Sequence, residues 1–254
     1  MQFLTDTWLV FSRPMRLSLR NPVWVILGLI QPILYLTLFG PLLEPVASAP
    51  GFPPGDAWQV FVPGLLVQLG MFGAAFAGFG LIAEWRAGVV ERMRVTPASC
   101  SALLLGRVLR DVVVLVVQGA ILIAAAIIFF DLSLSAASLL MGLVIVALLG
   151  GAISALSYGA ALKMKSEDAF APVINGLIVP VLLLSGILLP MTLAPGWLQT
   201  LADVNPLTHV VDGVRAIFRG ELWSGDAWLG SVITVALLVV GVLYGGWVFR
   251  KESA

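Results

Sequence analysis

Hydrophobic residues are concentrated in six long runs that are separated by more polar stretches. The runs cover residues 23–43, 58–82, 112–130, 136–162, 169–189 and 227–249. A helix of about 20 apolar residues crosses the hydrocarbon core of a bilayer, which is roughly 30 Å thick. Each run has about this number of residues or more. Lipid cannot hydrogen-bond the edge of an open sheet, and the runs lack the alternation of a membrane β-barrel. The pattern therefore predicts an all-α membrane protein with six transmembrane helices in a single domain, residues 1–254.

The segment before the first run, residues 1–22, has the pattern of an amphipathic helix. The apolar residues on one side of its helical wheel are Leu4, Trp8, Phe11, Met15 and Leu19. Arg13, Arg16 and Arg20 fall on another side, where they would face lipid phosphates. Pro14 should kink this helix or divide it into two. The segment is interpreted as a membrane anchor, as a docking surface for a partner, or as both.

A second segment outside the runs, residues 83–111, contains a predicted charged helix. This helix should end before Pro97, because a proline disfavours helical structure at the residue that precedes it. Its charged residues are Glu84, Arg86, Glu91, Arg92 and Arg94. A charged helix that connects two spans is well placed to receive force from a partner protein. An equally weighted alternative is a solvated loop that only sets the topology.

The third such segment, residues 190–226, is long but not very polar. Pro195 can open one short helix, and Asn205 followed by Pro206 provides a cap and a first residue for another. The apolar positions of the second helix are Leu207, Val210, Val211, Val214, Ile217, Phe218 and Leu222, and its charged positions are Asp212, Arg215 and Arg219. The segment is predicted to form two short amphipathic helices at or within the outer leaflet, or simply a structural cap on the bundle.

Composition and charge agree with a membrane protein and indicate its orientation. Only 11% of the residues are charged and the mean hydropathy is +1.04, whereas soluble domains carry about 25% charged residues. The net charge is zero, which gives no indication of nucleic-acid binding. With the N-terminus inside, 12 of the 14 Lys and Arg residues lie in inner segments, so the positive-inside rule places both termini in the cytoplasm.

The sequence lacks the residues that would supply energy or catalysis. It contains no P-loop and no H-E-x-x-H motif, and His209 and Cys100 are its single histidine and single cysteine. Asp111 and Asp131 are expected at the two water-accessible ends of the third span. The polar residues expected at membrane depth are Gln31, Gln68, Gln118 and Asn175. They are interpreted either as hydrogen-bonding groups between helices or as contacts to a substrate, and in the second case Gln68 and Asn175 are predicted to line the pathway. Uphill transport would therefore depend on another polypeptide.

Four stretches, in order along the chain, resemble the ABC-2 type permeases, which are the membrane subunits of bacterial ABC exporters. They are the N-terminal segment leading to Arg20-Asn21-Pro22, the stretch from Glu84-Trp85-Arg86-Ala87-Gly88 to Pro97, Ser185–Pro190 followed by Pro195-Gly196-Trp197-Leu198, and Asn205-Pro206-Leu207-Thr208 through Arg215. The second is similar to the family's E-x-R-x-G motif followed by E-R and a proline, and the last to its N-P-L-[ST] element.

The resemblance implies a role for each segment. The residues assigned by it to a coupling helix that contacts the ATPase are Glu84, Arg86, Gly88, Glu91, Arg92, Arg94 and Pro97. Residues 1–22, with Arg13, Arg16 and Arg20, match the family's connecting helix. The residues that would close the outer end as re-entrant helices are Pro190, Trp197, Asn205, Pro206, Leu207 and Arg215.

The resemblance also implies partners and a function. Two ATP-binding subunits, which carry ATP and Mg²⁺, would associate with this chain and a second, identical or paralogous permease subunit in the bacterial inner membrane. The chain itself would hold no cofactor and catalyse no reaction. Its apolar interior favours a lipophilic or amphiphilic cargo such as a drug, an antibiotic or a lipid. The alternatives are a membrane-embedded lipid-modifying enzyme and an ion-coupled carrier.

Overall fold

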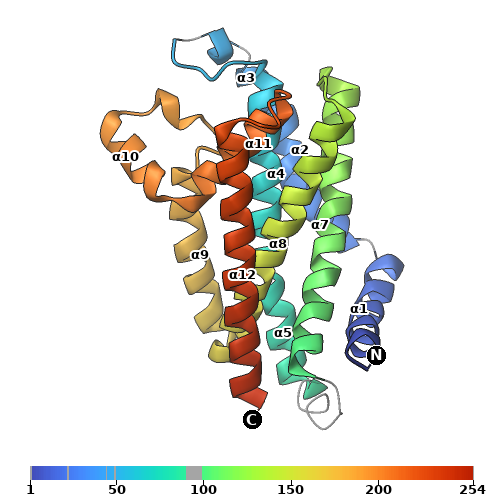
Figure 1. Ribbon diagram of the computed structural model, residues 1–254. Coiled ribbons are helices and arrows are strands. Elements are labelled where there is room, and N and C mark those ends of the chain that lie inside the picture. The colour runs from blue at the N-terminus through green and yellow to red at the C-terminus, as the bar shows by residue number, and fades with distance from the viewer. Residues whose placement is uncertain (1, 22, 44, 49, 90–98, 254) are drawn as a thin grey trace.

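The computed structural model of the chain is a bundle of long helices (Figure 1). It describes residues 2–21, 23–43, 45–48, 50–89 and 99–253. Six helical segments in these ranges are long and apolar enough to cross a membrane, which confirms the predicted number of spans. They are Val25–Leu43, Ala57–Arg86, Ser101–Phe130, Ala136–Met164, Glu167–Leu184 and Gly225–Glu252.

Every regular element in the described ranges is a helix. The first part of the chain, up to residue 86, contains α1 (Gln2–Arg20), α2 (Val23–Leu34), the π-helical turn η1 (Tyr35–Phe39), α3 (Gly40–Leu43), η2 (Val46–Ser48), α4 (Ala57–Ala75) and α5 (Ala77–Arg86). The second part consists of α7 (Cys100–Phe130), α8 (Ala136–Met164), α9 (Glu167–Leu184), η3 (Met191–Leu193), α10 (Gly196–Val204), α11 (Pro206–Phe218) and α12 (Gly225–Ser253).

The two ends of the bundle differ in what they carry. The C-terminal end of α12, helix α1, the end of α5 and the start of α7 lie at one end, here called the terminal end (Figure 1). Helices α3, α10 and α11 lie at the opposite end, here called the cap end. An even number of spans brings both termini to one side, as the sequence pattern requires.

Small residues allow the central helix α8 to pack closely against α12. A Cβ atom at Gly241 of α12 would lie 2.4 Å from the carbonyl oxygen of Ala152, and one at Gly245 would lie 2.8 Å from that of Ala155. Membrane helices have little hydrophobic drive to associate with one another in lipid, so such close backbone approaches supply much of their packing energy. The core is formed where α4, α7, α11 and α12 surround α8.

Two helices differ from the outline that the apolar runs predict. Helix α7 starts at Cys100, twelve positions before the predicted third span, and passes through the charged residues at 107, 110 and 111. The segment that contains the predicted second span consists of two helices, α4 and α5, which meet at Phe76. Charged residues were interpreted as the end of a span, but those of α7 have partners on neighbouring helices, and the helix continues through them.

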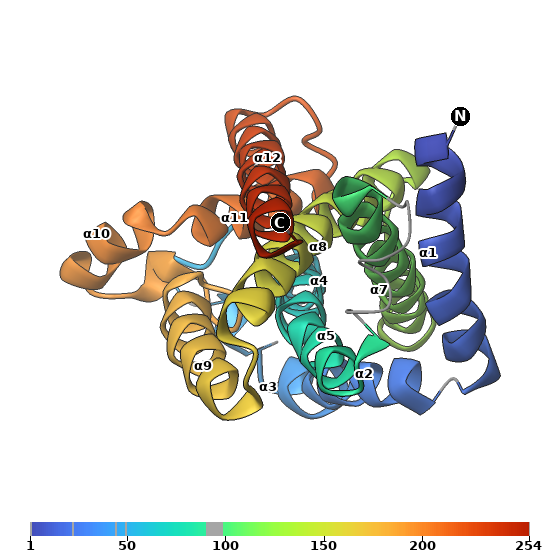
Figure 2. The same cartoon turned by 90° about the horizontal axis from the view of Figure 1, so that it is seen from below.

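Helix α1 lies against the side of α7 at the terminal end (Figure 2). A Cβ atom at Gly106 would lie 2.8 Å from the carbonyl oxygen of Thr7, so the two helices touch at a glycine. The helix is continuous through Pro14 and is not divided there. Its three cations Arg13, Arg16 and Arg20 are exposed, as are the large apolar side chains of Leu4, Trp8 and Leu19.

Candidate functional site

The last turn of α5 is joined to three other helical segments by charged side chains at the terminal end. Glu84 accepts a 2.5 Å hydrogen bond from Arg107 of α7. Arg86 lies 3.3 Å from Glu167, the first residue of α9. The ammonium group of Lys165, in the turn between α8 and α9, lies 4.7 Å from the ring centre of Trp85.

Lys165 extends this set of contacts to the sixth span. Its Nζ atom lies 2.6 Å from a carboxylate oxygen of Glu252 near the end of α12. Lys165 has a positive φ of 54° and ends α8 in a left-handed conformation. We refer to Glu84, Trp85, Arg86, Lys165 and their partners as the terminal-end cluster. Through it, the last turn of α5 is connected to α7, α9 and α12.

The predicted coupling residues are described only in part. Glu84 and Arg86 belong to the last turn of α5 and do not begin a separate helix, while Gly88 follows in a turn with φ of 68°. A positive φ is costly for residues with a Cβ atom, which accounts for glycine at this position. Glu91, Arg92, Arg94 and Pro97 lie outside the described residues.

A second polar network lies deeper in the bundle and joins α1, α7 and α8. Arg110 donates a 2.9 Å hydrogen bond to the hydroxyl oxygen of Ser18 and a 2.7 Å bond to the carboxylate of Asp111. Tyr158 donates a 2.5 Å bond to the other oxygen of Asp111. Asp111 is 5% exposed, so the prediction that it lies at a water-accessible end of its span is wrong.

The sequence analysis missed Tyr158 and the roles of Arg107 and Arg110. A signal was available, because Arg107, Arg110 and Asp111 are three and four positions apart and therefore share one face of a helix. That spacing indicates that α7 continues through them. Tyr158 gave no signal, since a tyrosine in an apolar run is also typical of ordinary packing.

At the cap end, side chains of α11 bind backbone carbonyls at the end of α9. Asn205 accepts a hydrogen bond from the Leu207 amide and caps α11, with Pro206 as its first residue, as predicted. The side-chain amide of Asn205 donates to the carbonyl of Val181, and Thr208 donates to that of Leu184. Carbonyls at a helix C-terminus have no partner within the helix, so these bonds satisfy α9 while they hold α11 in place.

Arg215 fixes the same helix to two further segments. Its side chain is almost fully buried and donates to the carbonyls of Val60 on α4 and Gly186 in the turn after α9. Asp212, one turn earlier, lies 3.3 Å from the guanidinium group. Burial lowers the pKa of Arg215 from its ordinary value, and Asp212 opposes that shift. Arg215 was expected on a polar face, but it is an internal brace of the cap end.

The other predicted gate residues are divided between the interior and the surface. Pro190 and Leu207 are buried, whereas Trp197 and Pro206 are exposed. Trp197 is 67% exposed on α10, which projects from the bundle (Figure 1). The cap end therefore consists of a buried brace, α11, and a projecting helix, α10.

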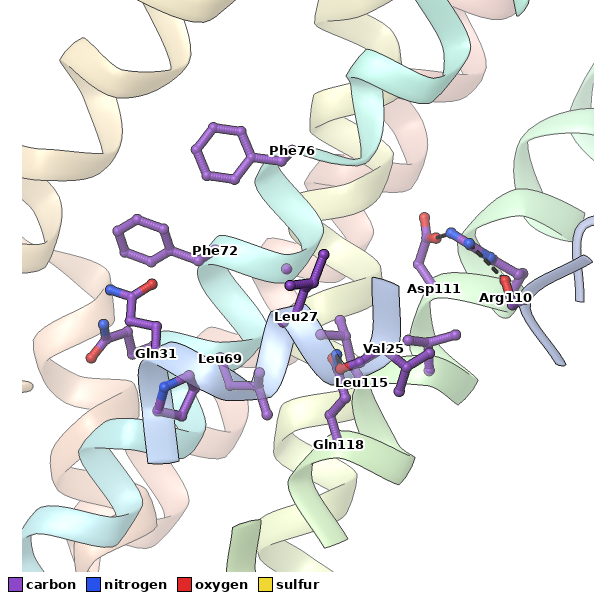
Figure 3. A pocket seen from close by; sticks show the side chains of 16 residues that line it. Val25, Leu27, Gln31, Leu69, Phe72, Phe76, Arg110, Asp111, Leu115 and Gln118 are labelled. Atoms are coloured by element: carbon purple, nitrogen blue, oxygen red, sulfur yellow. Dashed lines mark hydrogen bonds and ion pairs between the residues drawn. The ribbon is translucent and has the colours of Figure 1, made fainter. Parts of the chain in front are cut away.

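A cavity of about 390 Å³ lies between α2, α4 and α7 (Figure 3). Gln68, one of the two predicted pathway residues, lines it, together with Gln31 and Gln118. Asn175, the other one, lies on the exposed face of α9 and bonds to the Ala171 carbonyl of its own helix. Among the described residues, no three His, Cys, Asp or Glu side chains gather closely enough to hold a metal ion.

Comparison with known proteins points to membrane transport. The profile of the family described as "ABC-2 type transporter" matches residues 5–218. A protein of Cyanophora paradoxa named as a transport permease, ycf38, is 27% identical over 98% of this chain and 89% of its own. The daunorubicin resistance ABC transporter permease protein DrrB1 of Streptomyces coeruleorubidus is 24% identical over 99% of this chain and 87% of its own. The transport permease YvfS of Bacillus subtilis is 23% identical, covering 94% and 95%.

Proposed function

The chain belongs to the family of ABC-2 type transporter permeases, and we propose that it is the membrane subunit of an ATP-driven exporter in a bacterial inner membrane. Two copies of a separate ATP-binding subunit would drive it, and those subunits would hold ATP and Mg²⁺. A second permease subunit, identical or paralogous, would complete the pathway. The cargo would be a lipophilic or amphiphilic drug, antibiotic or lipid that leaves the cytoplasm.

The observation that carries this proposal is the terminal-end cluster. The segment that would contact the ATPase follows directly on the last turn of α5, and that turn is joined to α7, α9 and α12 by Arg107, Glu167 and Lys165. Binding of ATP would bring the ATPase subunits together and push on residues 84–97. The cluster gives that push a route to several spans, as a switch between inward-open and outward-open states requires.

The orientation rests on the distribution of cations. Helix α1, the C-terminal end of α12, the end of α5 and the start of α7 share the terminal end (Figure 1), and 12 of the 14 Lys and Arg residues belong to the segments that the sequence pattern assigns to that side. The positive-inside rule then assigns the terminal end to the cytoplasm, where an ATPase could reach it. The cap end, with α10 and α11, would face outward.

An ion-coupled carrier is the second candidate, because Asp111 is a carboxylate buried within a span, where transporters place coupling residues. Its two oxygens, however, are occupied by Arg110 and Tyr158. A carboxylate whose two oxygens are held by an arginine and a tyrosine is poorly placed to coordinate a transported metal cation. The exporter reading remains the better supported one.

The test uses the permease reconstituted with its ATP-binding subunit. We expect ATP-dependent uptake of daunorubicin into inside-out vesicles and faster ATP hydrolysis than by the ATPase alone, while the purified permease hydrolyses no ATP. An Arg92→Glu variant should lose the stimulation of hydrolysis. The matched control is Arg250→Glu, which reverses an exposed cation near the C-terminal end of α12 and should keep it. Uptake driven by a proton gradient without ATP would contradict the proposal.

A further inference from the structure

The cavity between α2, α4 and α7 is lined by both polar and apolar side chains. Its polar lining comes from Arg110, Asp111 and Ser18 and from the three amides of Gln118, Gln31 and Gln68. Its apolar lining comes from Val25, Leu27, Leu69, Phe72, Phe76, Val114 and Leu115. Figure 3 shows Phe72 and Phe76 on one side of the α2 helix and the Arg110–Asp111 pair on the other. An amphiphile likewise combines polar and apolar groups.

Gln68 is the observation that points to a ligand. Its side chain is 1% exposed, and neither its amide nitrogen nor its amide oxygen has a hydrogen-bond partner among the described residues. Buried side-chain amides are nearly always satisfied by protein, water or a bound group. By contrast, Gln118 at the same cavity donates to the carbonyl of Val25. A ligand with both a hydrogen-bond donor and an acceptor would satisfy the amide oxygen and the amide nitrogen of Gln68.

The charges of the cavity restrict the ligand to an uncharged group. Arg110 and Asp111 are the charged residues that line it, and they form an ion pair with each other at 2.7 Å. The cavity next to it shares Ser18 and Arg110 and is lined by a second balanced pair, Arg107 and Glu84. An ionic head group would find no free charge of opposite sign in this cavity. Burial of a charge without such a partner is costly.

We propose that this cavity binds an uncharged amphiphile, in which one hydroxyl or amide group meets Gln68 and an apolar body lies along Phe72, Phe76 and Leu115. Its volume of about 390 Å³ lies in the range of small-molecule sites, roughly 300–1,000 Å³. Only 22% of the most apolar window of the span that contains α2 is buried within the protein, so α2 is the wall that faces lipid or another subunit. The site rests on the geometry of this chain alone and not on the ATPase.

The test is binding by the purified full-length chain in lipid nanodiscs, without an ATPase. The probes are 1-pyrenebutanol, which has a hydroxyl, 1-butylpyrene, which has none, and 1-pyrenebutylamine, which is cationic. Protein-free nanodiscs of the same lipid give the background. We expect saturable binding of the alcohol, with binding of the other two at least fivefold weaker. A diazirine-bearing long-chain alcohol should label the peptide that contains Phe72 and Phe76, and the pyrene alcohol should compete with it.

Gln68→Leu provides the decisive variant, because leucine removes the amide with a small change in volume. The affinity for the alcohol should fall by about five- to tenfold, as expected for the loss of a hydrogen bond, while that for 1-butylpyrene stays unchanged. The control, Asn175→Leu, removes an amide from the exposed face of α9 and should alter neither affinity. Thermal unfolding shows that each variant is folded.

Two results would overturn the site: no binding above protein-free nanodiscs, or equal affinities of wild type and Gln68→Leu for the alcohol. Neither result would contradict the proposed exporter function, which is tested separately by stimulation of the ATPase. Conversely, if the chain binds the alcohol but fails to stimulate any ATP-binding subunit, the proposed site is supported and the proposed exporter function is contradicted.

Discussion

Arg215 and Val60 are 155 positions apart in the sequence, and a 3.0 Å hydrogen bond joins the guanidinium Nε of the first to the carbonyl oxygen of the second. The same guanidinium donates to the carbonyl of Gly186 at 2.7 Å. One side chain on α11 thus connects α4 with the turn after α9. The contacts between these segments at the cap end are therefore made by a charged side chain at a buried position, where an apolar residue is more usual.

Replacement of Arg215 by methionine should destabilise the protein by roughly 2–6 kcal/mol, because two buried carbonyls lose partners worth about 1–3 kcal/mol each. The measurement is thermal or denaturant-induced unfolding in detergent micelles. The control is Arg219→Met on the same helix end. Arg219 pairs with the half-exposed Glu221, and surface ion pairs contribute about 0–1 kcal/mol. Equal losses in the two variants would show that Arg215 is not a brace.

Tyr158→Phe should cost about 1.5–3 kcal/mol of stability, the range for a hydrogen bond to a charged group. The phenylalanine keeps the ring and leaves one oxygen of Asp111 without its donor. A double-mutant cycle with Asp111→Asn should give a coupling energy above 0.5 kcal/mol, because the two residues are in direct contact. Additive losses would contradict the observed pairing. Tyr244→Phe on α12 serves as the control tyrosine.

The sequence predicted the spans well because lipid imposes a length and a hydropathy that can be read along the chain. The start of α11 was equally legible, since Asn205 and Pro206 act on the residues next to them. The start of α7 could not be predicted in this way. Its charged residues depend on partners at Glu84 and Tyr158, which are far away in the sequence and brought close only by the fold.

The environment of Arg215 could not be predicted from the sequence, because its two partners on other segments are backbone carbonyls. Nothing in the residue types at positions 60 and 186 indicates that Arg215 would turn inward to meet them. The face assigned by helical spacing therefore gave the wrong environment for that residue. The sequence singles out Gln68 as a polar residue within an apolar run, but only the structure shows that its amide lacks a partner among the described residues.

Exchange of the charges of Arg86 and Glu167 tests whether the terminal-end cluster transmits force. Each side chain is roughly half-exposed, so each single reversal should change stability by less than about 1 kcal/mol. Each reversal should nevertheless reduce the stimulation of the ATPase severalfold, because α5 and α9 would then repel each other. The double variant, Arg86→Glu with Glu167→Arg, should restore stimulation. Failure of this rescue would assign Arg86 to direct contact with the ATPase.

Two glycines of α12 allow a matched test of its packing against α8. A Cβ atom at Gly241 would lie 2.4 Å from the carbonyl oxygen of Ala152, whereas one at Gly246 would meet nothing within 4 Å. Gly241→Ala should therefore force the helices apart and cost about 1–3 kcal/mol, the usual range for overpacking. Gly246→Ala should be neutral or stabilising by up to about 1 kcal/mol, because alanine favours helix over glycine. Both stabilities can be measured by unfolding in the same detergent. If the two variants unfold alike, the close approach of α8 and α12 is absent in the protein in solution.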